Sequence, residues 1–133
     1  MAFGVLETIS FSKVFGTIEK EEQEWIKKMI KKLEQNPFTG KPLGYAWFRE
    51  KKFKGKRLYY IIYEKQQKVL LVGFGVKKDQ QKMIAGTLEN METYKKIIEE
   101  KLVNGFLNTA ILDIFKTILK LNQQIVRQFR FFS

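Results

Sequence analysis

Apolar side chains recur with two different periods along the chain, and the change of period divides it into segments. Residues 5–15 alternate loosely between apolar and polar, which predicts a first strand that runs into a short helical turn. From Ile18 to Gln35 the apolar residues fall on one face of a helix and the lysines elsewhere, so we expect an amphipathic helix there. The Asn36-Pro37 pair predicts the end of that helix.

The middle of the chain has the patterning of strands. Residues 36–44 hold both prolines and predict a loop with stiff corners. Three aromatic or β-branched runs then follow and predict a meander of antiparallel strands. The runs cover residues 45–54, 56–64 and 68–76. The second and third are almost wholly apolar, which is typical of central strands covered on both faces.

Helical spacing returns in the last part of the chain, over residues 79–102 and again over 106–132, with Asn104-Gly105 expected to break it. We therefore predict one compact domain, because the chain is too short for two cores of ordinary size, and a further amphipathic helix at residues 106–132. Charged residues interrupt the most apolar segment, so no membrane span is expected. No secretory signal is visible at the start, which predicts a cytoplasmic protein.

Composition narrows the chemistry that the domain is able to perform. The chain has 133 residues, 44% of them apolar, which is enough for one core. Cysteine and histidine are both absent, and this excludes thiol nucleophiles, imidazole relays, disulfides and zinc sites built from those residues. Gly73-Phe74-Gly75 is not followed by the glycine-spaced turn and helix of a dinucleotide site. We expect no metal and no cofactor.

The net charge points to a polyanionic partner. Lysine and arginine total 25 against 14 acidic residues, a formal charge of +11. Residues 45–82 hold most of this excess, with 11 basic and three acidic side chains. The densest cluster takes six of the nine positions from 49 to 57: Arg49, Lys51, Lys52, Lys54, Lys56 and Arg57.

Strand geometry predicts how this cluster is arranged. Because side chains alternate across a strand, Arg49, Lys51 and Phe53 are expected on one face. Glu50, Lys52 and Lys54 are expected on the other, with Gly55 in the turn. So many cations require solvent or an anion. One interpretation is a lysine-rich edge that blocks aggregation. The other is a phosphate-binding surface whose flanking aromatic residues stack on bases.

RNA cleavage is a chemistry that such a surface can support without metal or histidine. The 2′-hydroxyl of RNA supplies the nucleophile, an arginine fork neutralises the transition-state charge, and a lysine crowded by other cations has a lowered pKa and carries protons. Such a ribonuclease needs another partner to orient its substrate.

Four segments resemble a known family in their order along the chain. The helix IKKMIKKLEQNP, the loop GKPLG, the hairpin FREKKFKGKRLYYIIYE and the segment KVLLVGFGVKKDQQKMI are similar to the RelE/ParE superfamily of toxins from toxin–antitoxin pairs, most of all to its archaeal RelE-like members. The resemblance runs from about Leu6 to Ile84. It implies an α+β domain at residues 1–102, in which N-terminal helices pack on a twisted antiparallel sheet. Residues 103–133 then exceed the usual family domain as a C-terminal amphipathic helical extension.

The resemblance also implies an activity and its residues. RelE-type members are ribosome-dependent mRNA endonucleases that inhibit translation, and an acidic antitoxin neutralises them. Arg57 matches the family arginine that contacts the scissile phosphate. Lys52 and Lys54 match its paired strand lysines, with Lys51 or Arg49 as alternatives of register. The further nucleic-acid contacts implied or expected are Arg49, Lys51, Lys56, Lys77, Lys78 and Lys82.

Two alternatives stay open at this point. RelE-type nucleases often place a tyrosine shortly after the last basic residue, whereas this chain has Met83-Ile84 there and no tyrosine until Tyr94. This difference favours a non-catalytic protein of the same fold that binds rRNA, DNA or gyrase through the basic sheet. The third interpretation makes residues 106–132 a homodimer interface.

Overall fold

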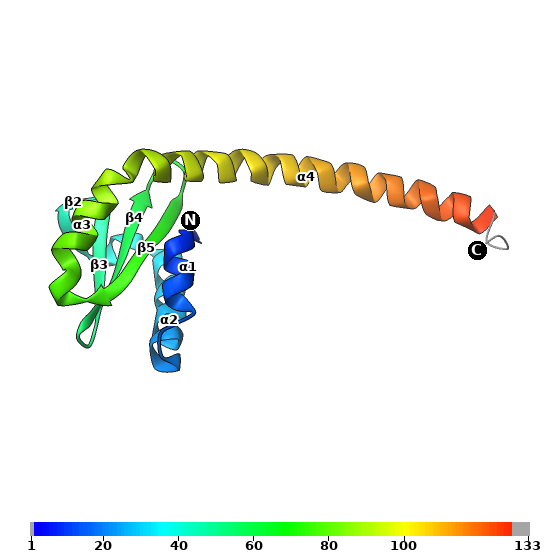
Figure 1. Ribbon diagram of the computed structural model, residues 1–133. Coiled ribbons are helices and arrows are strands. Elements are labelled where there is room, and N and C mark those ends of the chain that lie inside the picture. The colour runs from blue at the N-terminus through cyan, green and yellow to red at the C-terminus, as the bar shows by residue number, and fades with distance from the viewer. Residues whose placement is uncertain (1, 129–133) are drawn as a thin grey trace. The chain divides into compact units, whose positions relative to one another are not determined.

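The computed structural model describes the backbone of residues 2–128 and the side chains of residues 2–100, 111 and 113–121. The chain divides into two compact units, and the first unit ends at Met91 (Figure 1). In chain order the elements are β1 (Gly4–Glu7), α1 (Ile9–Phe15), α2 (Lys20–Gln35), the 3₁₀ turn η1 (Pro37–Thr39), β2 (Lys41–Tyr45), β3 (Phe48–Phe53), β4 (Lys56–Tyr63), β5 (Lys68–Val76), the 3₁₀ turn η2 (Lys77–Asp79), α3 (Gln80–Glu89) and α4 (Met91–Gln128).

The five strands form one sheet in the order β1-β5-β4-β3-β2. The predicted meander is confirmed, since β3, β4 and β5 pair as antiparallel neighbours. β1 lies parallel to β5, with Val5 opposite Val69, so the sheet is mixed rather than purely antiparallel. β1 and β2 lie at opposite edges of the sheet, and helices α1 and α2 connect them. A long helical connection of this kind allows β1 to run parallel to its neighbour β5, which a short hairpin would not.

The prediction that residues 36–44 are only a loop is wrong for its second half. Lys41–Tyr45 forms β2 and pairs with β3 through Lys41↔Glu50 and Tyr45↔Phe48, with an irregularity between. β2 is an edge strand, where proline is tolerated because one side of the strand makes no ladder hydrogen bonds. Pro42 and Gly44 are therefore typical of a loop, although pairing with β3 makes this segment a strand.

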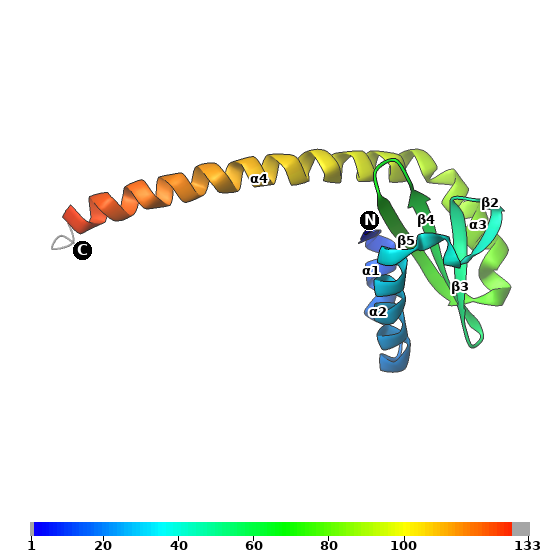
Figure 2. The ribbon, with the colours of Figure 1, turned by 180° about the vertical axis from the view of Figure 1, so that it is seen from behind.

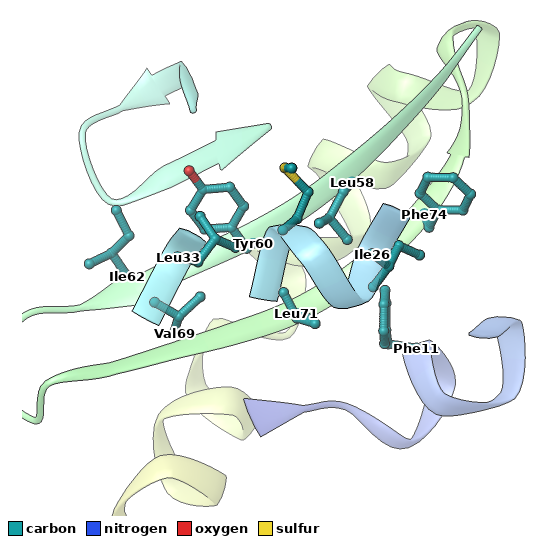
Figure 3. Close-up of a cluster of buried hydrophobic side chains, with 10 residues drawn as sticks. Phe11, Ile26, Leu33, Leu58, Tyr60, Ile62, Val69, Leu71 and Phe74 are labelled. Carbon is teal, nitrogen blue, oxygen red and sulfur yellow. The ribbon is translucent and has the colours of Figure 1, made fainter. Parts of the chain in front are cut away.

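Helices α1 and α2 pack on one face of the sheet, called here the α2 face (Figures 1 and 2). α2 turns its apolar stripe toward the central strands, and Ile26 and Leu33 are fully buried there (Figure 3). This packing is the main hydrophobic core. β4 supplies an apolar residue at every second position, and β5 does so up to the register irregularity that follows Leu71. The members of this core are Phe11, Ile26, Met29, Leu33, Leu58, Tyr60, Ile62, Val69, Leu71 and Phe74.

Helix α3 lies over the opposite face of the sheet, called here the α3 face (Figures 1 and 2). The contact is close at Gly73, where a Cβ atom would collide with the side chain of Met83. Gly73 is not part of a dinucleotide motif, and its position in β5 beneath Met83 gives the reason for the missing side chain. With a helix on each face, β4 and β5 are buried almost throughout, as their apolar composition predicts.

The prediction that the helical region breaks at Asn104-Gly105 is wrong, because the division lies at Asn90. Asn90 ends α3 because its backbone N–H and its side-chain amide both donate to carbonyls of the last turn, including that of Gly86. α4 then continues without a break from Met91 to Gln128, so the domain boundary predicted after residue 102 falls within it. A glycine inside a long helix costs only about 1 kcal/mol, which is too little to end it.

Tyr60 fixes the loop before β2 to the centre of the sheet. Its hydroxyl donates to the carbonyl of Pro37 at 2.6 Å and accepts from the N–H of Gly40 at 3.0 Å. Burial raises the pKa of Tyr60 to about 12, against the opposing effects of the Gly40 N–H and the Arg49 charge. The folded protein therefore holds the Tyr60 proton more tightly than the unfolded chain, whose tyrosines titrate near pH 10.

This pKa difference predicts a loss of stability at alkaline pH. The contribution is complete below about pH 10 and disappears as pH rises toward 12, and it amounts to roughly 2–3 kcal/mol. Thermal unfolding of wild type and Tyr60→Phe between pH 8 and 11.5 measures it. Wild type should lose melting temperature more steeply above pH 10 than the variant, which should be less stable at pH 8 because two polar groups lose their partner. Parallel curves would contradict this role of Tyr60.

Candidate nucleic-acid interface

The β3–β4 hairpin divides the predicted basic cluster between the two faces of the sheet. Lys52 pairs with Arg57, and Glu50 pairs with Tyr59. Since Leu58 and Tyr60 lie in the core on the α2 face, Arg57 and Tyr59 lie on the α3 face, together with their partners. Arg49, Lys51 and Phe53 are on the α2 face, as strand alternation predicts.

Arg57 lies in a buried polar group on the α3 face. Its Nε is 3.9 Å from Oε2 of Glu50, and Nε2 of Gln80, the first residue of α3, donates to the same oxygen at 2.6 Å. The exposed fractions of Arg57 and Glu50 are 7% and 3%. Nε of Arg57 has no hydrogen-bond partner within the described part of the chain. Gln80 thus anchors the Glu50 carboxylate, and the ion pair of Glu50 with Arg57 leaves the Arg57 Nε without a hydrogen bond.

Tyr59 extends this polar group along β4. Its hydroxyl is buried and, among the side chains described, makes no hydrogen bond. Burial raises the pKa of Tyr59 and the charge of Glu50 raises it further, while Arg57 opposes them. On β5, Gly75 is paired with Arg57, and a Cβ atom at Gly75 would meet nothing within 4 Å. The sheet surface next to Arg57 is therefore open on the β5 side.

Four exposed lysines lie on β3, η2 and α3. Lys52 is exposed on the α3 face, and Lys77 at the start of η2 is tied to the hairpin because its N–H donates to the carbonyl of Gly55 at 3.3 Å. Lys78 and Lys82 are also exposed on η2 and α3. None of these four ammonium groups lies within ion-pair distance of a carboxylate of the described residues. They are cations available to a phosphate backbone.

Two lysines of the predicted basic cluster instead form ion pairs with glutamates of α2. Lys54, expected on the face of Lys52, lies in the turn with a positive φ of 54°, and its Nζ is 2.9 Å from Glu21. Nζ of Lys56 is 2.7 Å from Glu22, and this pairing lowers the pKa of the Glu22 carboxyl. The prediction that Lys52 and Lys54 share a face is wrong, because strand alternation stops where the turn begins.

Arg49 and Lys51 occupy the α2 face as well. The Arg49 guanidinium donates to the carbonyls of Ala46, Phe38 and Gly40 at 2.7–3.0 Å, so it ties the loop before β2 to β3. Burial and the nearby charge of Lys32 lower the pKa of Lys51. The single solvent-facing cluster expected around Gly55 is therefore divided into two groups. Lys52 and Arg57 are on the α3 face, and the other four cations are on the α2 face or in the turn.

Most aromatic residues that flank the cluster are used for packing. Tyr59 and Phe48 are buried, and Phe53 stacks on Trp25 of α2 with ring centroids 4.9 Å apart. Tyr45 is 45% exposed and stacks on Trp47, and Phe38 is 39% exposed. The Tyr45–Trp47 pair is at the opposite end of β3 from Lys52. Cations and rings meet on the α2 face instead, where Nζ of Lys54 and Nζ of Lys56 lie 5.4 and 5.5 Å from the ring centroids of Phe53 and Phe74.

Sequence reasoning missed Glu50 and Gln80 as members of the site. Alternation already placed Glu50 on the face of Lys52, and this signal was available. Gln80 gave no signal, because only the return of α3 across the sheet brings it to Glu50. No group of three or more acidic side chains within the described residues is arranged to hold a metal ion. Among the described helices, none combines the length and apolar composition that crossing a membrane requires.

Comparison with known proteins identifies the fold. No protein-family model and no curated protein sequence matches the chain. Among solved structures, a double mutant of the E. coli toxin RelE in the free state matches with a TM-score of 0.60 at 17% identity, covering 68% of this chain and 98% of that chain. The intact E. coli RelBE toxin–antitoxin complex matches with a TM-score of 0.53 at 19% identity, over 56% and 96% of the two chains. The toxin–antitoxin complex RelBE2 from Mycobacterium tuberculosis matches with a TM-score of 0.52 at 17% identity, over 58% and 100%. The chain therefore has the fold of the RelE toxins.

Proposed function

We propose that this protein is the toxin of a toxin–antitoxin pair and that it inhibits translation by cutting mRNA on the ribosome. The fold supports the first part, because the solved structures that share it include RelE both alone and in complex with an antitoxin. The α3 face supports the second part. The observation that carries the proposal is the pairing of Lys52 with Arg57 beside the open surface at Gly75, with Lys77 at the adjacent turn.

The proposed reaction needs no metal. The 2′-hydroxyl of the RNA gives up its proton to water and its oxygen attacks the phosphorus. A 2′,3′-cyclic phosphate forms as the bond to the 5′-oxygen of the next nucleotide breaks. Arg57 neutralises the negative charge that grows on the phosphate oxygens, since a guanidinium fork binds two of them. Lys52 is directly opposite Arg57 on the neighbouring strand, where Cβ atoms are about 5 Å apart. Its ammonium group donates a proton to the leaving oxygen. Glu50 positions the guanidinium through its ion pair.

Two partners complete the proposal. The ribosome holds the mRNA in line for attack, which compensates for the absence of histidine in the chain. Lys77, Lys78 and Lys82 contact the phosphate backbone on the way to Arg57. An acidic antitoxin binds the basic domain and neutralises it, since opposite charge favours fast association.

The test is mRNA cleavage on stalled ribosomes by the full chain, with the same mRNA free in solution as the second substrate. We expect cuts in ribosome-bound mRNA and at least a hundredfold fewer cuts in free mRNA. Absence of cleavage in both would reject the nuclease, and equal cleavage in both would reject the role of the ribosome.

A second function is favoured by the burial of Arg57. A guanidinium that is 7% exposed and paired with Glu50 suits a protein that binds rRNA, DNA or gyrase on this face without cutting. The residues after η2, which include no tyrosine before Tyr94, agree with it. Binding that weakens steeply with salt, together with intact mRNA in the ribosome assay, would support this function over the first.

A further inference from the structure

Helix α4 exposes a row of large apolar side chains that the proposed function does not use. The six residues lie within three turns of the helix and are 44–61% exposed. They are Ile111, Ile114, Phe115, Ile118, Leu119 and Leu121. An apolar surface of this size on a helix rarely remains in contact with water, and it usually marks a site of association.

The spacing of these residues is that of a coiled coil. Ile111, Ile114, Ile118 and Leu121 follow one another at intervals of three, four and three, which places them at the a, d, a and d positions of a heptad repeat. A strict 3-4-3 spacing forms a narrow seam along the helix, onto which a second helix packs knobs into holes. Phe115 and Leu119 widen the seam on one side.

The charge pattern favours a second copy of this chain as the occupant. Asp113, Lys116 and Lys120 are exposed on the helix outside the four seam positions, so the seam contains no charge that would select an acidic partner. A heptad seam is complementary to itself, because the same residues form both the knobs and the holes. Isoleucine at both a positions with leucine at the second d position favours two strands, whereas isoleucine at the first d position, Ile114, favours three or four strands.

We propose that two copies of this chain associate through α4, with the residue 111–121 seams packed against each other as a two-stranded coiled coil. Six half-exposed side chains present on the order of 500 Å² per copy, so a pair buries on the order of 1,000 Å², near the lower end of specific interfaces. The proposal does not depend on RNA cleavage, since none of these residues belongs to the α3 face.

The absence of cysteine in the sequence makes a clean cross-linking test available. Ile118→Cys places one thiol in the seam, and Lys120→Cys places one outside it as the matched control. In a parallel pair Ile118→Cys should form a disulfide dimer at least tenfold faster than Lys120→Cys under mild oxidation. In an antiparallel pair the fast disulfide should instead join Ile114→Cys to Ile118→Cys when the two variants are mixed. Equal rates for seam and control thiols in both experiments would overturn the proposal.

Light scattering of the full chain gives the second measurement. Wild type should have the mass of two chains, and the double variant Ile114→Asp/Ile118→Asp should dissociate with a Kd raised at least a hundredfold. The control Lys116→Asp/Lys120→Asp adds the same two acidic residues outside the seam and should remain a dimer. A wild-type monomer, or equal dissociation of both double variants, would reject the interface, and a mass of three or more chains would reject the two-stranded form.

Discussion

Arg57→Ala should reduce cleavage of ribosome-bound mRNA by two to three orders of magnitude. The reason is that Arg57 is the arginine on the α3 face beside Lys52, and its Nε makes no hydrogen bond with any described residue. This donor is therefore available to a phosphate oxygen. Removing one preorganised donor from a developing oxyanion costs about 10²–10³ in rate. Single-turnover cleavage on stalled ribosomes with saturating protein measures the loss in the chemical step, separately from binding.

The single variant leaves the Glu50 carboxylate buried without its cation, so its folding needs a control. Glu50→Gln/Arg57→Met removes both charges at similar side-chain volume, and replacing a buried ion pair in this way is often neutral for stability. We expect the double variant to unfold within a few degrees of wild type and still to lack cleavage. A folded double variant that cleaves at the wild-type rate would remove Arg57 from the mechanism.

Lys52→Ala should lower the cleavage rate about a hundredfold, whereas Lys54→Ala should leave it within twofold of wild type. The two lysines are two positions apart, but Lys52 lies beside Arg57 on the α3 face and Lys54 forms an exposed ion pair with Glu21 of α2. Loss of a proton donor costs about 10²–10⁴. An exposed ion pair contributes at most about 1 kcal/mol to stability, so Lys54→Ala should fold normally.

The variants Lys52→Ala and Lys54→Ala are controls for each other, because each removes one positive charge from the same hairpin. If long-range attraction for RNA were the only role of the cluster, both variants would weaken binding equally and would share one salt dependence. Equal loss of cleavage in the two variants would therefore contradict the division of the cluster between two faces.

Local sequence determined the elements of the domain. The helix at α2 and the strands β3, β4 and β5 follow from hydrophobic periodicity, and these elements are confirmed within a few residues. Their apolar faces also indicate that β4 and β5 are central. Turn residues were less informative, since Pro42 and Gly44 suggested a loop where an edge strand lies, and Asn104-Gly105 suggested a break that does not occur.

The α3 face could be predicted only in part. Alternation along β3 separates Lys52 from Arg49 and Lys51, because side-chain direction in a strand is a local property. The fate of Lys54 is different, since its partner Glu21 is distant in sequence and meets it only when α2 packs beside the hairpin. Gln80 reaches Glu50 for the same kind of reason, through the path of α3.

Residue type and neighbours along the chain were enough to predict α2 and β3 to β5, the basic character of the middle third and the absence of thiol and imidazole chemistry. The fold was needed to show that β1 runs parallel to β5, that Lys54 and Lys56 pair with α2, and that Arg57 is buried between Glu50 and the open surface at Gly75. These features depend on contacts between residues far apart in sequence, whose geometry is set by the packing of the core and not by local propensity.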